Sequence, residues 1–265
     1  MQPPPARELA LRKVTRMSEF TNLPPFVLVV DQTSKERLEY DDDPTGLLDR
    51  SDLAIVSTNL PSDAPPWQLD LRRRGQLVLN NTLVQDPMHP GVFFSADEAD
   101  WQIASAKATV FSQLCQLLGA RKVTVDLVQE LNSRGTSDFT VKGGKPKLVS
   151  GAASVHNETV EKVVSSMSLG DEFAGGDPDL AESSRLLHMC GLDGDNTMSR
   201  LVTHRSSGTN QLSSSKFHVN LSSEAIRTLQ AAASISIPLY LNLKVDLKKV
   251  YEDASTFSAT YAVEF

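Results

Sequence analysis

The feature that most constrains the fold is a change in the spacing of apolar residues near position 119. Over residues 95–118 apolar side chains recur at every third or fourth position, as on one buried face of an α-helix; they are Trp101, Ala104, Ala108, Phe111, Cys115 and Leu118. From Lys122 onwards the spacing becomes two, as in a β-strand. Gly119, between the two patterns, is of the residue type that commonly ends helices. The sequence therefore predicts a central helix over residues 95–118 that leads into a strand.

The predicted helix also carries signals for its first turn. Ser95 and Glu98 have the S-x-x-E spacing of a capping box, in which each side chain satisfies a free backbone N–H of the other residue. Asp97 and Glu98 place negative charge at the positive end of the helix dipole. Both observations predict that the helix begins at Ser95.

Apolar and polar residues alternate through much of the C-terminal part of the chain. From Ile235 to Leu247 every second residue is apolar, and the alternation resumes from Phe257 to Phe265. The residues between the two runs include the turn-like segment Glu252–Ser255. Two such runs predict a long antiparallel β-hairpin, with Pro238 at an edge or at the start of its first strand. We expect the apolar face of this hairpin to pack against the central helix.

The remaining elements are predicted from shorter patterns. The uninterrupted apolar run Phe26–Val30 predicts a strand that is buried on both faces. Further strands are predicted at Leu53–Ser57, within Trp67–Asn80, and at Phe139–Val141, Leu148–His156, Thr159–Met167 and Phe217–Leu221. Helices are predicted at Arg7–Phe20, between Asp177 and Gly191, and from Ser222 or Ser223 to Ala233. The charged segment Asp31–Ser51, which contains Asp41, Asp42 and Asp43, is predicted to be a solvated loop.

Together these elements predict an α+β fold, in which a mostly antiparallel sheet packs against the central helix over residues 95–118. At 265 residues the chain has the length at which one hydrophobic core can split into two. Residues 1–94 are expected to form a smaller N-terminal α/β portion. Residues 95–265 are expected to form the sheet-and-helix domain that ends in the long hairpin, and one continuous domain is the alternative.

The charge of the chain argues against one broad class of function. Lys and Arg number 26 and Asp and Glu number 33, which gives a formal net charge of −7. Nucleic-acid binding depends on clustered cations that neutralise phosphates, so nucleic acid is not expected as a partner of this chain. The basic clusters that exist, Arg72 to Arg74 and the group Lys142, Lys145 and Lys147, are short.

Cysteine content and the N-terminal sequence bear on the cellular compartment. Cys115 and Cys190 are the two cysteines, too few for a disulfide framework or a zinc site, and we expect them to be buried and reduced. The first twenty residues mix prolines and charged residues and contain no apolar region typical of an export signal. No apolar stretch has the length of a membrane-spanning helix. A cytoplasmic location is therefore expected.

The sequence from Asp193 to Thr197 is the strongest candidate for a catalytic motif. It reads D-x-D-x-T, the pattern with which phosphotransferases of the haloacid dehalogenase type supply a nucleophile and an acid while they hold magnesium. That chemistry requires the first aspartate at the end of a buried parallel strand, whereas the preceding residues predict a helix. We therefore expect a polar turn here. A calcium loop is also excluded, because Met198 and His204 occupy the positions that need Gly and Glu.

The five histidines give no catalytic or metal-binding pattern. His89, His156, His188, His204 and His218 do not pair at the spacings typical of zinc sites. Motifs for phosphate loops, dinucleotides and nucleophile elbows are also absent from the sequence, so no cofactor is predicted. Catalytic and metal-binding residues are unassigned at this stage. The segment Lys142 to Lys147 is predicted to be a solvated turn.

These observations predict a non-catalytic interaction module, a subunit or effector that works through a protein partner or through self-association. In one variant the C-terminal hairpin inserts into a membrane and the tip at Lys142 to Lys147 touches anionic lipid, because alternating strands of that length are also found in membrane β-structures. The alternative is a metal-dependent hydrolase or phosphotransferase that uses Asp193 and Asp195.

Overall fold

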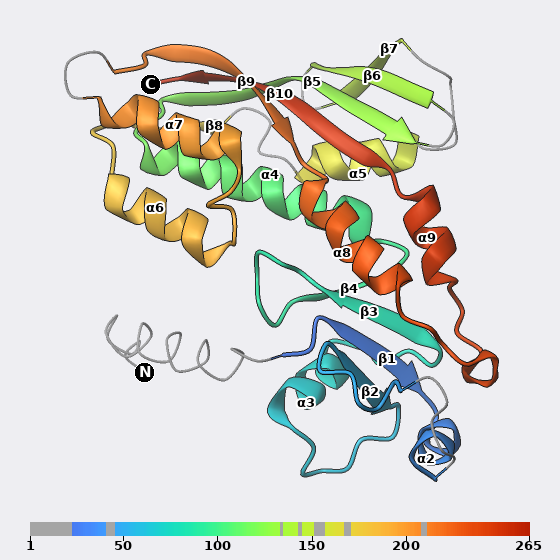
Figure 1. Cartoon of the computed structure of the whole chain (residues 1–265). Helices are drawn as coiled ribbons and strands as arrows, with labels where there is room; N and C mark the ends of the chain where they lie inside the picture. The colour runs from blue at the N-terminus through green and yellow to red at the C-terminus, as the bar shows by residue number, and fades with distance from the viewer. Residues whose placement is uncertain are drawn as a thin grey trace, which may run out of the picture. The chain divides into compact units, whose positions relative to one another are not determined.

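A computed structural model of the chain describes residues 23–40, 46–132, 135–142, 145–150, 157–166, 171–207 and 211–265. The chain divides into two compact units, each with its own sheet (Figure 1). The first unit extends to Ser95 and also contains Ser236–Val245, and the second contains Ala96–Ile235 and Asp246–Phe265. Two mostly antiparallel sheets and several helices make an α+β fold, which confirms the predicted class. The predicted division of the chain into a portion of residues 1–94 and a domain of residues 95–265 stays a prediction.

The first unit contains a four-stranded sheet of order β2-β1-β3-β4. Its strands are β1 (Phe26–Val30), β2 (Leu53–Ser57), β3 (Asn81–Gln85) and β4 (Phe93–Ser95). β1 pairs parallel with β2 and antiparallel with β3, and all five of its residues are buried, as predicted from its uninterrupted apolar run. The hydrophobic core cluster of this unit consists of Val27, Val29, Val56, Leu71, Leu83 and Phe93.

Two segments of the first unit are helical where the sequence predicted otherwise. α2 (Gln32–Tyr40) replaces part of the predicted loop, because Asp31 Oδ1 accepts a hydrogen bond from Ser34 N at 2.7 Å and so caps the helix. α3 (Pro66–Arg73) replaces the first part of the strands predicted within Trp67–Asn80, and residues 74–80 contain no strand. Proline at the first position of α3 is preorganised for a helix.

The second unit contains an antiparallel sheet whose main strands follow the order β7-β6-β5-β10-β9. The strands are β5 (Lys122–Asn132), β6 (Gly135–Lys142), β7 (Lys145–Ser150), β8 (Asp171–Glu172, paired with β5), β9 (Ser214–Asn220) and β10 (Thr256–Glu264). The helices are α4 (Ala99–Leu117), α5 (Asn157–Ser166), α6 (Leu180–Met189), α7 (Asn196–Ser206), α8 (Ser223–Ala233) and α9 (Leu247–Asp253). Helices α4 to α8 lie on one side of this sheet in Figure 1.

The predicted central helix is confirmed as α4, which packs beneath the sheet. Phe111 is fully buried, and its ring centroid lies 4.5 Å from that of Tyr261 on β10. The predicted capping box is wrong, because Ser95 belongs to β4 and the N-cap residue Glu98 makes no side-chain cap hydrogen bond. Gly119 ends the helix region with φ +80, as predicted, and a Cβ atom there would collide with the carbonyl oxygen of Gly176.

The predicted C-terminal hairpin is half wrong. Its second arm is β10, which pairs with β5 and β9 instead of with the preceding residues. Its first arm, residues 235–247, contains a 3₁₀ turn at Leu239–Leu241 and the start of α9, but no strand. Pro238 lacks the N–H that a central strand needs, and Asp246 caps α9 by accepting hydrogen bonds from Lys248 N and Lys249 N.

The other predictions for this unit have mixed outcomes. Strands at Phe139 and Leu148 are confirmed in β6 and β7, but the strand predicted over Thr159–Met167 is wrong. α5 forms there because Val160, Val163 and Val164 have the spacing of a helix face, and all three are buried. α6 begins later than predicted, with Asp179 as its N-cap, and α8 follows Ser222 as predicted. The predicted helix Arg7–Phe20, the run Asp41 to Asp43, His156 and the glycines between Lys142 and Lys145 lie outside the described residues.

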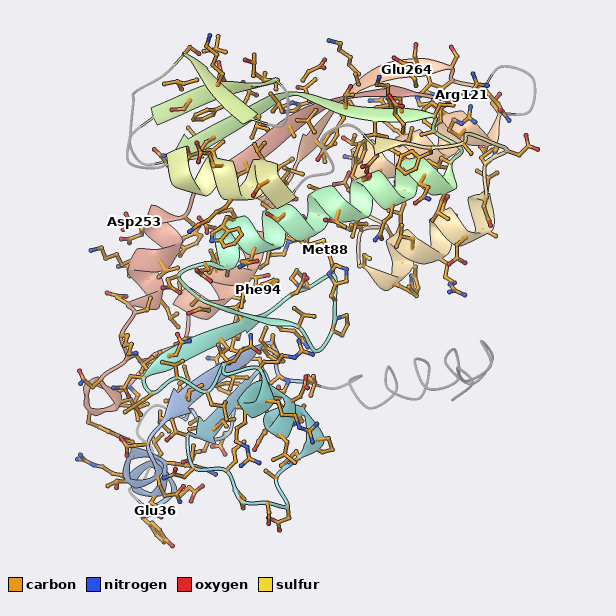
Figure 2. All side chains as sticks on the ribbon, turned by 180° about the vertical axis from the view of Figure 1, so that it is seen from behind. Glu36, Met88, Phe94, Arg121, Asp253 and Glu264 are labelled. Carbon is orange, nitrogen blue, oxygen red and sulfur yellow. The ribbon has the colours of Figure 1, made fainter. Side chains whose placement is uncertain are left out.

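Two further observations complete the fold. The ends of the central strands meet where Arg121 N donates to Glu264 O at 2.7 Å, and Figure 2 labels both residues. None of the described helices combines the length and the apolar character needed to cross a membrane.

Candidate functional site

The structure gives Asp195 a clear position, at the N-terminus of α7. Its Oδ1 atom accepts hydrogen bonds from the backbone N–H groups of Thr197 and Met198, each at 3.0 Å. Its Oδ2 atom lies 2.7 Å from Nζ of Lys107, a residue of α4 whose side chain is fully buried. Oδ1 of Asp195 therefore caps α7, and Oδ2 joins α7 to α4.

Lys107 is the centre of a buried ionic cluster, which we call the Lys107 cluster. Besides Asp195, its ammonium group contacts Glu224 Oε2 at 2.8 Å and Ser223 Oγ at 2.9 Å. Ser223 and Glu224 belong to the first turn of α8, so one lysine joins α4 to the N-termini of α7 and α8. The sequence contained a signal for this lysine, because it stands three residues after Ala104 and four before Phe111 on the apolar face of the predicted helix.

Asp193 does not join this cluster. Its Oδ2 atom lies 3.2 Å from Nδ1 of His188, and both side chains are exposed. The two aspartates of the D-x-D-x-T pattern therefore have separate partners. Across the part of the chain that the structure describes, no group of three or more His, Cys, Asp and Glu residues is arranged to hold a metal ion.

His89 forms a pair with the buried carboxylate of Asp86 in the loop between β3 and β4, where Figure 2 labels the neighbouring Met88. Nδ1 of His89 lies 2.7 Å from Asp86 Oδ2, and Asp86 Oδ1 accepts a hydrogen bond from Met88 N at 2.9 Å. The hydrogen bond to Asp86 raises the pKa of His89, and partial burial opposes this effect. The pair therefore ties the imidazole to the loop backbone.

The two cysteines are buried, as the sequence predicted. Desolvation raises the pKa of the Cys115 thiol, so this sulfur stays protonated and is a poor nucleophile. Burial also raises the pKa of the neighbouring Tyr261 hydroxyl. These groups belong to the core beneath the sheet.

Two histidines, which the sequence left unassigned, line one cleft between α7 and β9. The cleft has a volume of about 260 Å³, and its lining residues are Thr197, Arg200, His204, Leu212, Ser215, Lys216, Phe217 and His218. Thr197, Arg200 and His204 are spaced by three and four positions and so lie on one face of α7. Thr197 Oγ1 donates a hydrogen bond to the His218 carbonyl oxygen at 3.3 Å, which connects the two walls.

β9 forms one wall of this cleft and is the last strand of the sheet. Its register pairs Ser215 with Val263 and Phe217 with Tyr261 of β10, and Phe265 N donates to Ser213 O at 2.8 Å. In an antiparallel ladder the residues that share hydrogen bonds recur at every second position. The odd-numbered residues of β9 therefore bond to β10.

The even-numbered residues of β9 direct their backbone groups away from the sheet. These residues are Ser214, Lys216 and His218, and the contact of Thr197 with the His218 carbonyl agrees with this direction. Among the described residues, no backbone hydrogen bond reaches the N–H groups of these three residues. Lys216 O has a 3.5 Å contact with Ser215 Oγ. β9 thus presents a main-chain edge that can accept another strand.

The charge of the cleft contrasts with that of the whole chain. Arg200, His204 and Lys216 are exposed, and no acidic side chain lines the cleft among the described residues. Lys216 Nζ lies 2.6 Å from Asp126 Oδ2 in an exposed ion pair. Within the same described part of the chain, Arg200 has no ion-pair partner. Arg200 therefore gives the cleft an uncompensated positive charge on a chain of net charge −7.

Sequence reasoning identified β9 as a strand, but not its position at the edge of the sheet. No local pattern could give that position, because it depends on which strands pair with β10.

No protein family model, no curated protein and no solved structure matches this chain.

Proposed function

We propose that this protein is an interaction module that binds an extended segment of a partner protein by adding it as a strand to the outer edge of β9. The observation that carries the proposal is the row of outward backbone groups at Ser214, Lys216 and His218 beside the α7–β9 cleft. Strand addition to an exposed sheet edge is a common way to bind a peptide: main-chain hydrogen bonds supply affinity, and pockets for alternate side chains supply specificity.

The size of the edge limits the bound segment to a short one. From Ser214 to His218 the strand rises by about 13 Å, at about 3.3 Å per residue. Thr197 already occupies the carbonyl oxygen of His218, so pairing is expected mainly at Ser214 and Lys216. Because each main-chain hydrogen bond contributes only about 1 kcal/mol, side-chain contacts with α7 must supply part of the affinity.

Two earlier expectations bear on this proposal. The membrane-directed variant required a C-terminal hairpin, and the first arm of that hairpin is not a strand. The hydrolase or phosphotransferase alternative required Asp193 and Asp195 to act together, whereas Asp195 is bound to Lys107 and Asp193 to His188. Neither idea gains an observation in its favour, so the interaction module is the function that we put forward.

The proposal can be tested by NMR titration of the full chain with a capped hexapeptide of alternating valine and threonine, an uncharged extended probe. We expect the largest amide shifts at Ser214 and Lys216. Shifts confined to residues outside β9 and α7 would overturn the proposal.

A pair of variants at Lys216 separates main-chain pairing from charge. Lys216→Gln removes the charge and keeps the outward N–H, whereas Lys216→Pro removes both without removing a hydrogen bond to β10. We expect Lys216→Pro to weaken binding of the probe at least tenfold and Lys216→Gln less than threefold. Equal affinities of the proline variant and the unmodified chain would show that strand addition does not occur.

A further inference from the structure

We infer that the segment recognised at the β9 edge is acidic and that Arg200 of α7 binds one of its carboxylates. The inference rests on the proposed function, because an added strand is what brings side chains of a partner over α7. The partner is thus an extended peptide segment with glutamate or aspartate at alternate positions.

The direction of the side chains supports this inference. Phe217 of β9 points to the helix layer, where its ring centroid lies 6.3 Å from that of Phe111 on α4. Side chains alternate between the two faces of a sheet, so alternate side chains of an added strand point to the same helix layer. There they meet the face of α7 that carries Thr197, Arg200 and His204.

The chemistry of that face selects an anion. Arg200 is exposed and has no ion-pair partner among the described residues, and its planar guanidinium matches a carboxylate with two parallel hydrogen bonds. No acidic side chain lines the cleft within the described residues, so nothing there competes for Arg200. A basic side chain on the bound segment would instead be placed beside a cation and would be repelled.

The opposite face of the added strand meets Lys216. This side chain lies on the outer face of the sheet, because side chains alternate along β9 and those of the odd-numbered residues Phe217 and Val219 point inward. Its ion pair with Asp126 is exposed, with 71% and 37% of the two side chains accessible, so it contributes little stability. A segment whose carboxylates all point to α7 directs its other side chains to this outer face, so the preference for acidic residues at alternate positions rests on Arg200.

The test uses the full chain and three capped hexapeptides in which valine alternates with glutamate, with glutamine or with lysine. Affinities are measured by calorimetry, and amide shifts of β9 report where each peptide binds. We expect the glutamate peptide to bind at least tenfold more tightly than the glutamine peptide, and the lysine peptide to bind most weakly. If the glutamine peptide binds at β9 as tightly as the glutamate peptide, this inference fails and the proposed function stands. If none of the three shifts the β9 amides, both fail.

Variants at two exposed arginines sharpen the result. Arg200→Gln should remove most of the preference for glutamate over glutamine. Arg185→Gln on α6, which removes an arginine outside the cleft, is the matched control and should keep the full preference. An undiminished preference in Arg200→Gln, or an equal loss in both variants, would overturn the role of Arg200.

Discussion

Two cations of the second unit, Lys107 and Arg200, differ in almost every respect. Lys107 is fully buried and contacts two carboxylates and a hydroxyl at 2.7 to 2.9 Å. Arg200 is exposed on α7 and has no ion-pair partner among the described residues. A buried charge must be neutralised within the fold, whereas an exposed one is solvated and free to bind a ligand. This difference gives Lys107 a structural role and leaves Arg200 available for the proposed recognition.

The largest effect is expected when Lys107 loses its charge. Lys107→Met keeps an unbranched side chain of similar length but leaves Asp195 and Glu224 close together without a cation, so the free energy of unfolding should fall by about 3–5 kcal/mol. Urea denaturation measures this change. Lys122→Met, which removes an exposed partner of Glu172, is the control and should cost at most about 1 kcal/mol. Equal losses would mean that the Lys107 cluster contributes no more than a surface pair.

A smaller effect is expected at Asp195. Asparagine can still cap α7, so Asp195→Asn removes only the charged contact with Lys107. Because Lys107 keeps its contact with Glu224, the free energy of unfolding should fall by about 2 kcal/mol. Asp193→Asn, at the other aspartate of the same motif, should change the free energy of unfolding by less than about 0.5 kcal/mol because its side chain is exposed. If thermal or urea unfolding showed that Asp193→Asn destabilises the protein more than Asp195→Asn does, the structural role assigned to Asp195 would be wrong.

His89 is intermediate between the buried Lys107 and the exposed Arg200, since its ring is partly exposed and its partner Asp86 is buried. The pKa of His89 is raised in the folded state, so the stabilising contact is fully present below the unfolded pKa and is lost as pH rises through the folded pKa. His89→Gln should therefore reduce the free energy of unfolding more at pH 5 than at pH 8. Solvent screening limits the difference to less than about 1 kcal/mol. A constant difference across this pH range would show that the ionised pair does not form.

The smallest effect on stability is expected at Arg200. Arg200→Gln should change the free energy of unfolding by less than about 0.5 kcal/mol, because no contact within the described residues depends on its charge. Denaturation of the variant measures this directly. A loss as large as that of Asp195→Asn would place Arg200 in the structural class and remove the basis for its role in recognition.

Local sequence predicted elements well where the pattern and the backbone chemistry agreed. The apolar run of β1 and the helical spacing around Phe111 led to correct elements, because no breaker interrupts either of them. The alternation from Ile235 to Leu247 is as regular as that of β10, yet it forms no strand, since Pro238 cannot donate and Asp246 caps a helix. Alternation alone therefore did not decide between the two arms.

The candidate site was less predictable than the fold. The sequence singled out Asp193 and Asp195 because they stand close together in a known pattern, but Asp193 contacts the nearby His188, whereas Asp195 contacts Lys107, which lies 88 residues earlier in the chain. Arg200, His204 and Lys216 form no motif, and the cleft exists because α7 lies beside β9. Residues brought together by tertiary packing leave no local signal.

The sequence by itself determined the α+β class, the central helix and the strand character of Phe26–Val30, Phe217 and Phe257–Phe265, because apolar spacing follows directly from which face of an element is buried. The tertiary structure decided which strands pair, that β9 ends the sheet, and that Asp195 neutralises Lys107. These outcomes depend on hydrogen bonds and charges between residues distant in the chain, whose partners are fixed only when the elements pack together.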